Sequence, residues 1–158
     1  MATASDFEFT TVWELPAPVE RVWDELLDVD AWPAWWRGFE RVDFVRAGDA
    51  NGVGNVRDLV TRGRLPYRLH YRVEVVRVEP LRLIEARSTG ELEGVGRWTT
   101  EPTDRGTRAV YLWQVRTTNR LLRALSPIAR GTLTRNHDQV MEWGREGLLG
   151  RLGVPAAS

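Results

Sequence analysis

The sequence contains no cysteine and no lysine, and each absence removes a class of chemistry. Without cysteine the chain can form no disulfide framework, no thiolate nucleophile and no zinc or iron–sulfur site built on sulfur. Without lysine it can form no Schiff base with a carbonyl substrate and no lysine-dependent phosphate loop. The two histidines are far apart in the sequence and cannot make a metal site by themselves, so we expect no metal and no cofactor.

Long apolar runs and a net charge are also missing. No run approaches the roughly 20 apolar residues that a membrane span needs, and the first residues lack the basic start and apolar stretch of a signal peptide. The 22 basic residues, all arginine, balance 22 acidic ones, so the overall charge gives no reason to expect nucleic acid as a partner. We therefore expect a cytoplasmic protein with no integral membrane segment, folded as a single domain over residues 1–158.

Hydrophobic periodicity predicts a strand followed by two short helices. Apolar residues alternate over 7–15, which is typical of a strand with one buried face. They recur at helical spacing over 19–27, directly after Pro18, a residue that the first helical turn tolerates. A further short helix rich in tryptophan is capped by Asp30 and closed by Gly38.

The rest of the chain is predicted to form six strands and one long helix. Short loops of Gly, Pro, Asn and Asp separate the strand segments, as antiparallel hairpins require. The segments are about 39–46, 54–62, 67–78, 81–89, 92–101 and 107–117. The long helix is predicted to begin at Ser126-Pro127 and to stay free of further proline until Pro155.

This order of elements resembles the helix-grip fold of the SRPBCC superfamily, which includes START, polyketide cyclase and lipid-transfer proteins. Four stretches are similar in spacing and order to its bacterial polyketide cyclase/dehydrase-like branch. They are Pro18-Val-Glu-Arg-Val-Trp-Asp24, Trp32-Pro-Ala-Trp-Trp36, Gly90-Glu-Leu-Glu-Gly-Val-Gly-Arg-Trp98, and Asn136-His-Asp-Gln-Val-Met141 followed by Glu146-Gly-Leu148. The resemblance covers nearly the whole chain. It implies an α+β fold in which a curved antiparallel seven-stranded sheet wraps a long C-terminal helix and leaves an internal cavity for an apolar or amphipathic molecule.

Aromatic side chains are candidates for the wall of that cavity. The alternation of apolar and polar residues in 67–78 turns the tyrosines inward and His70 outward, which makes His70 a poor candidate. The inward set comprises Tyr67, Tyr71, Trp98, Tyr111 and Trp113, with Trp13 as a further member. Two interpretations of these rings stay open: a packed core that satisfies its own OH and NH groups, or a lining that stacks on a ring-shaped ligand.

The long helix carries one apolar stripe that contains a histidine. At 100° per residue the stripe consists of Leu133, His137, Val140, Met141, Gly144 and Leu148. A titratable side chain in such a stripe must find a partner or stay neutral. His137 is therefore either a core histidine with a protein partner, a hydrogen-bonding group for a ligand, or a catalytic proton carrier.

Other residues of this helix are candidate ligand contacts. Val140 and Met141 would line the cavity, and Gly144 would let the sheet or a ligand approach the backbone closely. Asn136 flanks the stripe and could reach the edge of the pocket. Arg130, near the stripe, could hold a carboxylate or polarise a carbonyl oxygen, or else be solvated at the start of the helix.

Two further charged features have more than one interpretation. Asp58 alternates in phase with Val56 and Val60, which would put it inside the sheet as a candidate ligand contact. Residues 105–137 carry seven arginines and no acidic residue. This stretch, with Leu121, Leu122, Leu125 and Ile128 interleaved, is either a solvated surface or a site that touches an anionic membrane or an acidic acyl carrier protein.

The resemblance and the residues together predict that the chain binds a hydrophobic, aromatic or polyketide-like small molecule in an internal cavity. One alternative is a polyketide aromatase/cyclase that acts on a carrier-tethered poly-β-ketone. In that case tyrosines and Arg130 would polarise carbonyl groups, and His137 or a bound water would move protons. A second alternative is a protein-interaction module with a partner on its outer surface and a collapsed cavity.

Overall fold

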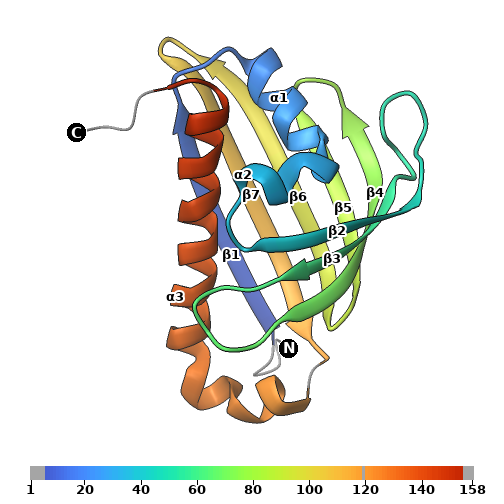
Figure 1. The fold of residues 1–158 in the computed structure, drawn as a ribbon, viewed down its shortest axis with the longest axis vertical. Helices are drawn as coiled ribbons and strands as arrows, with labels where there is room; N and C mark the ends of the chain where they lie inside the picture. The colour runs from blue at the N-terminus through green and yellow to red at the C-terminus, as the bar shows by residue number, and fades with distance from the viewer. Residues whose placement is uncertain (1–5, 119, 155–158) are drawn as a thin grey trace.

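A curved antiparallel sheet and a long helix that lies against its concave face make up the computed structural model, which describes residues 6–118 and 120–154 (Figure 1). Within the long helix, the side chains at 121–123 and 125–129 are not described. The strands are β1 (Asp6–Leu15), β2 (Phe39–Arg46), β3 (Val56–Thr61), β4 (Leu69–Glu79), β5 (Leu83–Gly90), β6 (Leu92–Thr103) and β7 (Gly106–Thr117). The helices are α1 (Val19–Leu27), the 3-10 turn η1 (Val29–Ala31), α2 (Trp32–Trp35) and α3 (Arg120–Arg151).

The seven strands form one sheet in the order β1-β7-β6-β5-β4-β3-β2, and every neighbouring pair is antiparallel. Six of the strands therefore follow one another as a meander, and β1 adds to the open side of β7. The connection α1–η1–α2 runs from one edge strand, β1, to the other, β2. The helix-grip fold expected from the sequence is confirmed.

The core lies between α1, one end of the sheet and the C-terminal half of α3. Val22, Trp23 and Leu26 form the buried face of α1, as its helical periodicity predicts. They share a cluster of buried side chains with Trp13 from β1 and Leu148 from α3. This cluster fills one end of the space under α3.

Two glycines let α2 dock against α3. A Cβ at Gly144 would overlap the indole ring of Trp36, and one at Gly147 would overlap the carbonyl oxygen of Trp35. The indole Nε1 of Trp36 donates a hydrogen bond to the carbonyl oxygen of Val140, at 2.8 Å. The close approach expected at Gly144 is therefore present, but Trp36 makes it.

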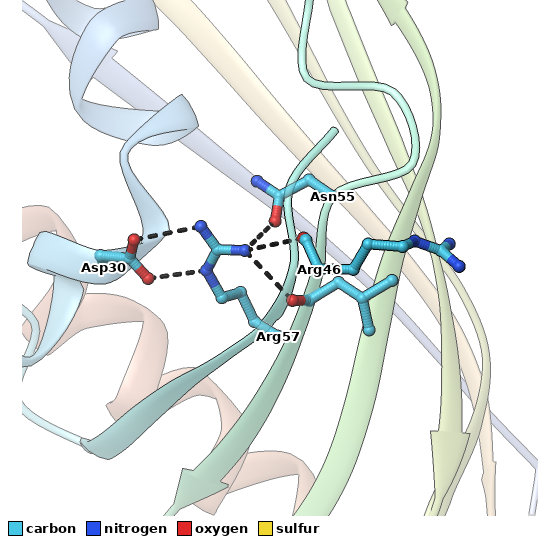
Figure 2. Close-up of polar contacts among 5 residues, drawn as sticks. Asp30, Arg46, Asn55 and Arg57 are labelled. Atoms are coloured by element: carbon cyan, nitrogen blue, oxygen red, sulfur yellow. Dashed lines mark hydrogen bonds and ion pairs between the residues drawn. The ribbon is translucent and has the colours of Figure 1, made fainter. Parts of the chain in front are cut away.

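Arg57 is a buried cation that fastens the helical connection to the sheet, as Figure 2 shows. Its Nε and Nη2 donate to the two carboxylate oxygens of Asp30 in η1, at 2.7 and 3.1 Å. Its Nη1 donates to the carbonyl oxygens of Arg46 and Val56, at 3.2 and 3.1 Å, and to the side-chain oxygen of Asn55. One guanidinium thus joins η1 to β2, β3 and the loop before β3.

The predicted element boundaries are correct to within two residues for all seven strands, but the predicted start of the last helix was wrong. The structure begins α3 at Arg120, so that Ser126 and Pro127 lie inside it. Proline lacks a backbone donor, which makes it a good marker of a first helical turn, but a helix that bends can also contain one. Figure 1 shows the first turns of α3 at an angle to the rest of the helix.

Candidate ligand-binding cavity

A cavity of about 130 Å³, here called the main chamber, lies between the sheet and the middle of α3. Its walls come from β1, the α2–β2 region, the β3–β4 connection, β6, β7 and α3. Among the residues that α3 contributes are Val140 and Met141, as predicted, and Leu133 of the same stripe. The chamber therefore lies at the end of the fold that the core leaves open.

A second cavity of about 90 Å³, the inner chamber, adjoins the first. Six aromatic side chains line both chambers: Trp32, Phe39, Tyr71, Trp98, Tyr111 and Trp113. The last four, which come from the sheet, are called here the aromatic partition. The rings of Trp98 and Tyr111 stack with centroids 4.7 Å apart, and Trp113 follows at 6.4 Å from Tyr111. The structure brings these four predicted residues together at the cavity, and their role as ligand contacts stays a prediction.

The two tyrosines of the partition are uncharged phenols. Burial raises the pKa of Tyr71 to about 12, and its hydroxyl is hydrogen-bonded with Thr61. Burial likewise raises the pKa of Tyr111, whose hydroxyl lies over Gly96, where a Cβ would come within 2.5 Å of it. At neutral pH both side chains can share a hydrogen bond with a ligand, but neither can serve as a charged base.

The loop between β3 and β4 forms the rim of the main chamber and is tied to α3 by Asn136. The Oδ1 of Asn136 accepts hydrogen bonds from the backbone N–H groups of Arg64 and Leu65, at 2.8 and 3.2 Å. Gly63 makes room for this contact, because a Cβ there would overlap the Asn136 amide. Figure 1 shows this loop beside α3. The half-buried Tyr67, whose pKa is raised by burial, lines the chamber from the same loop.

The clamp formed by Asn136 was missed by the sequence analysis, which placed this residue only near the pocket edge. An amide side chain next to the apolar stripe was the available signal. Its partners are backbone groups 71 and 72 residues away, and no spacing rule identifies such a pair.

His137 is the titratable side chain of the chamber wall. Its side chain is 8% exposed, and its ring stacks on Phe9 with centroids 3.9 Å apart and lies 5.4 Å from the ring of Trp113. Neither ring nitrogen has a hydrogen-bond partner among the residues that the structure describes. The nearest carboxylate oxygen, from Asp138, is 3.6 Å from Nδ1, too far for a hydrogen bond.

Burial lowers the pKa of His137 to about 4, and the neighbouring Asp138 carboxylate opposes that shift without cancelling it. The imidazole is therefore uncharged at neutral pH, with one nitrogen as a donor and the other as an acceptor. The sequence analysis considered a core histidine satisfied by a protein partner. The structure shows instead a buried ring at the cavity wall, with two nitrogens that have no partner in the described part of the chain.

The prediction that Asp58 lies inside the sheet was wrong. Its carboxylate is 44% exposed on the outer face and accepts two hydrogen bonds from Arg72, at 2.7 and 2.9 Å. The Arg72 guanidinium holds the pKa of Asp58 below its usual value. Alternation failed here because β3 is buried on both faces, so that Val56 and Val60 do not mark the inward one.

Two other predicted contacts also lie outside the residues that line the chambers. Arg130 is exposed, with its guanidinium 4.9 Å from the ring centroid of Phe7. Gly144 is covered by the indole ring of Trp36. Both were chosen for their place on the helical stripe, but the cavity extends along only part of that stripe.

The remaining sequence features lie on the outer surface. His70 is exposed, as expected. In the arginine-rich stretch, Arg108 pairs with Glu14 and Arg116 with Glu93 across neighbouring strands. The side chains at Leu121, Leu122, Leu125 and Ile128, interleaved in that stretch, lie outside the described residues. Over 6–118 and 120–154, no helix has the length and apolarity to cross a membrane, and no three His, Asp or Glu side chains form a metal-binding group.

Comparisons with known proteins point to one family. The profile of the family described as polyketide cyclase / dehydrase and lipid transport matches residues 6–142 of this chain. No curated protein sequence matches it.

Among solved structures, the Zhui aromatase/cyclase from Streptomyces sp. R1128 is similar with a TM-score of 0.72 and 19% identity, over 94% of this chain and 93% of that one. A START superfamily protein from Mycobacterium smegmatis has a TM-score of 0.72 and 12% identity, over 94% and 97% of the two chains. The di-domain ARO/CYC StfQ from the steffimycin biosynthetic pathway has a TM-score of 0.69 and 18% identity, over 96% of this chain and 53% of that one. At these identities the likeness shows the fold.

Proposed function

Since this chain belongs to the polyketide cyclase / dehydrase and lipid transport family, we propose that its cavity binds a hydrophobic, aromatic or polyketide-like small molecule. The observation that carries the proposal is the main chamber of about 130 Å³, which has mostly aromatic and aliphatic walls. Binding sites for small molecules are typically concave and apolar, with a few polar groups that fix the orientation of the ligand.

The chemistry of the walls supports an aromatic ligand. Tyr111 and Trp113 line the chamber with aromatic rings, against which a flat ligand can pack. His137 and the tyrosine hydroxyls supply a few hydrogen-bonding groups in a largely apolar surface. Such a surface discriminates by shape and by the place of one or two polar atoms on the ligand.

Native mass spectrometry tests the proposal directly. We would examine the protein as isolated and after incubation with fatty acids, sterols, simple phenols, flavonoids and aromatic polyketides. We expect a 1:1 adduct with the aromatic classes. The absence of an adduct with every class would contradict the proposal.

A matched pair of variants locates the site. The first variant, Val115→Phe, changes a buried residue that lines the main chamber. The second, Val12→Phe, changes a residue of β1 that is 52% exposed. Both changes add the same ring to a strand. We expect the first to weaken the adduct at least about tenfold, because the new ring occupies the chamber, and the second to leave it unchanged. Equal binding by both variants would place the ligand elsewhere.

A second candidate function is aromatase/cyclase chemistry on a carrier-tethered poly-β-ketone. The unpaired ring nitrogens of His137 at the chamber wall favour it, because a neutral imidazole can take a proton from a carbon between two carbonyl groups. The resulting enolate would attack a second carbonyl carbon of the same chain. The alkoxide so formed would then recover the proton, and loss of water would lead to the aromatic ring.

Substitution of His137 separates this chemistry from simple binding. His137→Gln keeps a polar side chain of similar reach, so we expect affinity to stay within about tenfold of the original. If the imidazole is the base, turnover of a carrier-tethered substrate is lost. Unchanged turnover would exclude that role. The protein-interaction alternative predicted a collapsed cavity, and the two chambers give it no support.

A further inference from the structure

The cavity space is divided into two small chambers. The main chamber measures about 130 Å³ and the inner chamber about 90 Å³. For comparison, an engineered apolar cavity of about 150 Å³ holds one benzene molecule. The interior of the main chamber therefore has the size of a single aromatic ring, and a ligand with several fused rings would have to extend into the inner chamber or out through the open side of the main chamber.

The aromatic partition between the chambers is anchored in the core. Trp98 is 5% exposed and packs against Trp13, with ring centroids 4.8 Å apart. Tyr71 is held through its hydrogen bond with Thr61. To merge the chambers these rings would have to leave well-packed positions, and packed cores resist such displacement. Ligand size is thus limited by side chains that also stabilise the fold.

His137 gives the main chamber one fixed polar position. The ring is held by stacking on Phe9, so its two nitrogens cannot turn freely toward other groups. Both are buried and unpaired among the described residues, which costs free energy that a hydrogen-bonding ligand would recover. The Asp138 carboxylate, 3.6 Å from Nδ1, favours the proton on that nitrogen, which leaves Nε2 as an acceptor. A ligand hydroxyl suits this situation, because it can either donate or accept.

The charge of the walls excludes an ionised ligand group from the interior. No Asp or Glu lines the main chamber in the described part of the chain, and its charged lining residue, Arg62, is exposed at the rim. A carboxylate or an ammonium group placed beside His137 would lose its water without gaining a buried counter-ion. An uncharged ligand meets no such penalty.

We propose that the main chamber binds a simple uncharged phenol, with its single ring against the aromatic partition and its hydroxyl hydrogen-bonded to His137. This inference rests on the proposed function, that the cavity binds a hydrophobic small molecule, and narrows its ligand class. It sets single-ring phenols above the multi-ring molecules that a larger undivided cavity would take.

Titration calorimetry with three probes tests the size limit and the hydroxyl contact in the unmodified protein. The probes are p-cresol, toluene and a three-ring phenol such as 1-anthracenol. We expect p-cresol to bind at least about tenfold more tightly than toluene, since one hydrogen bond to a buried group is worth about that factor. We expect 1-anthracenol to bind at least about tenfold more weakly than p-cresol, because the partition blocks it.

The outcomes distinguish this inference from the proposed function. Tight 1:1 binding of 1-anthracenol with weaker binding of p-cresol would overturn the single-ring limit and leave the proposed function standing. Equal affinities for toluene and p-cresol would overturn the contact with His137. If no aromatic probe binds in calorimetry and no adduct forms in the mass spectrometry panel, both this inference and the proposed function are overturned.

A matched pair of histidine variants assigns the hydroxyl contact. In His137→Leu the ratio of the toluene and p-cresol dissociation constants should fall from about ten to about one, because the hydrogen-bonding partner is gone. His70→Leu, the same change on the exposed outer face, should leave the ratio as it was. An unchanged ratio in His137→Leu would contradict the contact.

A spectroscopic measurement covers the case in which His137→Leu does not fold. In the unmodified protein, the ¹⁵N resonances of the His137 imidazole should shift on addition of p-cresol, since a hydroxyl partner changes the state of one ring nitrogen. The His137 resonances should shift much less on addition of toluene. The resonances of His70 should not shift with either compound. Equal shifts of His137 with both compounds would overturn the proposal.

Discussion

Among the single residues, His137 couples the pH to the stability of the whole fold. Burial lowers its pKa from 6.5 to about 4, so that the native imidazole resists protonation where the unfolded one accepts it. As the pH falls from 6.5 toward 4, the unfolded chain therefore binds more protons at this site than the native chain does. The free energy of unfolding must decrease over that window, and the site has no effect above it.

We predict that His137→Gln flattens the pH dependence of the free energy of unfolding between about pH 4 and 6.5. The contribution removed is on the order of 3 kcal/mol over the full window. Urea unfolding at a series of pH values would measure it. His70→Gln, on the exposed face, is the control and should keep the original slope. If His137→Gln and the unmodified protein lose stability in parallel, His137 is not the group that titrates.

The neighbours Arg57 and Asp58 show what alternation in a strand can and cannot assign. Alternation correctly says that they point to opposite faces. It does not indicate which face is inward when both faces are largely buried, as they are in β3. The decisive facts are the partners: Arg57 reaches Asp30, and Asp58 pairs with Arg72. These contacts join residues 27 and 14 positions apart.

At the scale of elements, the contact between α2 and α3 depends on glycines at defined positions of α3. Gly144 and Gly147 have no room for a Cβ, whereas Gly150 on the same helix has no atom within 4 Å of that position. Alanine favours a helix by up to about 1 kcal/mol over glycine. The same substitution should therefore have opposite effects along one element.

We predict that Gly150→Ala is neutral or stabilising, by up to about 1 kcal/mol. Gly147→Ala should be destabilising by about 1–3 kcal/mol, because the new Cβ would overlap the backbone carbonyl of Trp35, which cannot rotate away. The effect of Gly144→Ala on stability should lie between these two, since the new Cβ meets the indole ring of Trp36, which can shift only at the expense of core packing. Denaturant unfolding of the three variants would establish the order, and equal stabilities would contradict the proposed close contact.

The β3–β4 loop lines the rim of the main chamber, and Asn136 holds it to α3. We predict that Asn136→Ala increases the hydrogen-exchange rates of the Arg64 and Leu65 amides at least about fivefold, since each loses a hydrogen bond worth about 1 kcal/mol. Mass-spectrometric exchange on loop peptides would measure the change.

The adjacent Arg135→Ala provides the control for Asn136→Ala. The exposed Arg135 donates to Thr132 within α3 and has no contact with the loop in its described hydrogen bonds, so exchange in the loop should stay unchanged. Faster exchange in both variants would indicate a general loosening of α3. Unchanged exchange in Asn136→Ala would mean that the clamp does not restrain the loop.

For the whole molecule, the sequence predicted the parts whose causes are local. Alternation and turn residues gave the seven strands, and the apolar stripe gave the face of α3 that meets the sheet. The aromatic partition depends instead on register: Trp98 faces Tyr111 because β6 and β7 pair at that step, and Tyr71 joins them from β4. The volume left between such side chains follows from packing over the entire fold, so no sequence pattern could divide the cavity into two chambers.

The helical connection α1–η1–α2 is fastened to the sheet by a buried cation, Arg57, whose partner Asp30 has a side chain that is 55% exposed. The α1–η1–α2 connection spans the two edge strands, and Arg57 ties its η1 turn to β2 and β3 (Figure 2). Removal of the guanidinium leaves Asp30 without its cation and leaves the carbonyl groups of Arg46 and Val56 without this donor. Because the Val56 carbonyl is buried, leaving it without this donor costs more than the loss of an exposed pair, whereas water can reach the Asp30 carboxylate.

We therefore predict that Arg57→Leu lowers the free energy of unfolding by about 1–3 kcal/mol. The matched change Arg72→Leu removes a solvent-exposed pair with Asp58 and should have a much smaller effect, because water and salt already screen that pair. Raising the salt concentration should reduce the difference in unfolding free energy between Arg72→Leu and the unmodified protein. It should leave the stability lost in Arg57→Leu nearly unchanged. Equal and salt-sensitive losses in the two variants would mean that the Arg57 network is only another surface ion pair, and that the helical connection is held by its tryptophans alone.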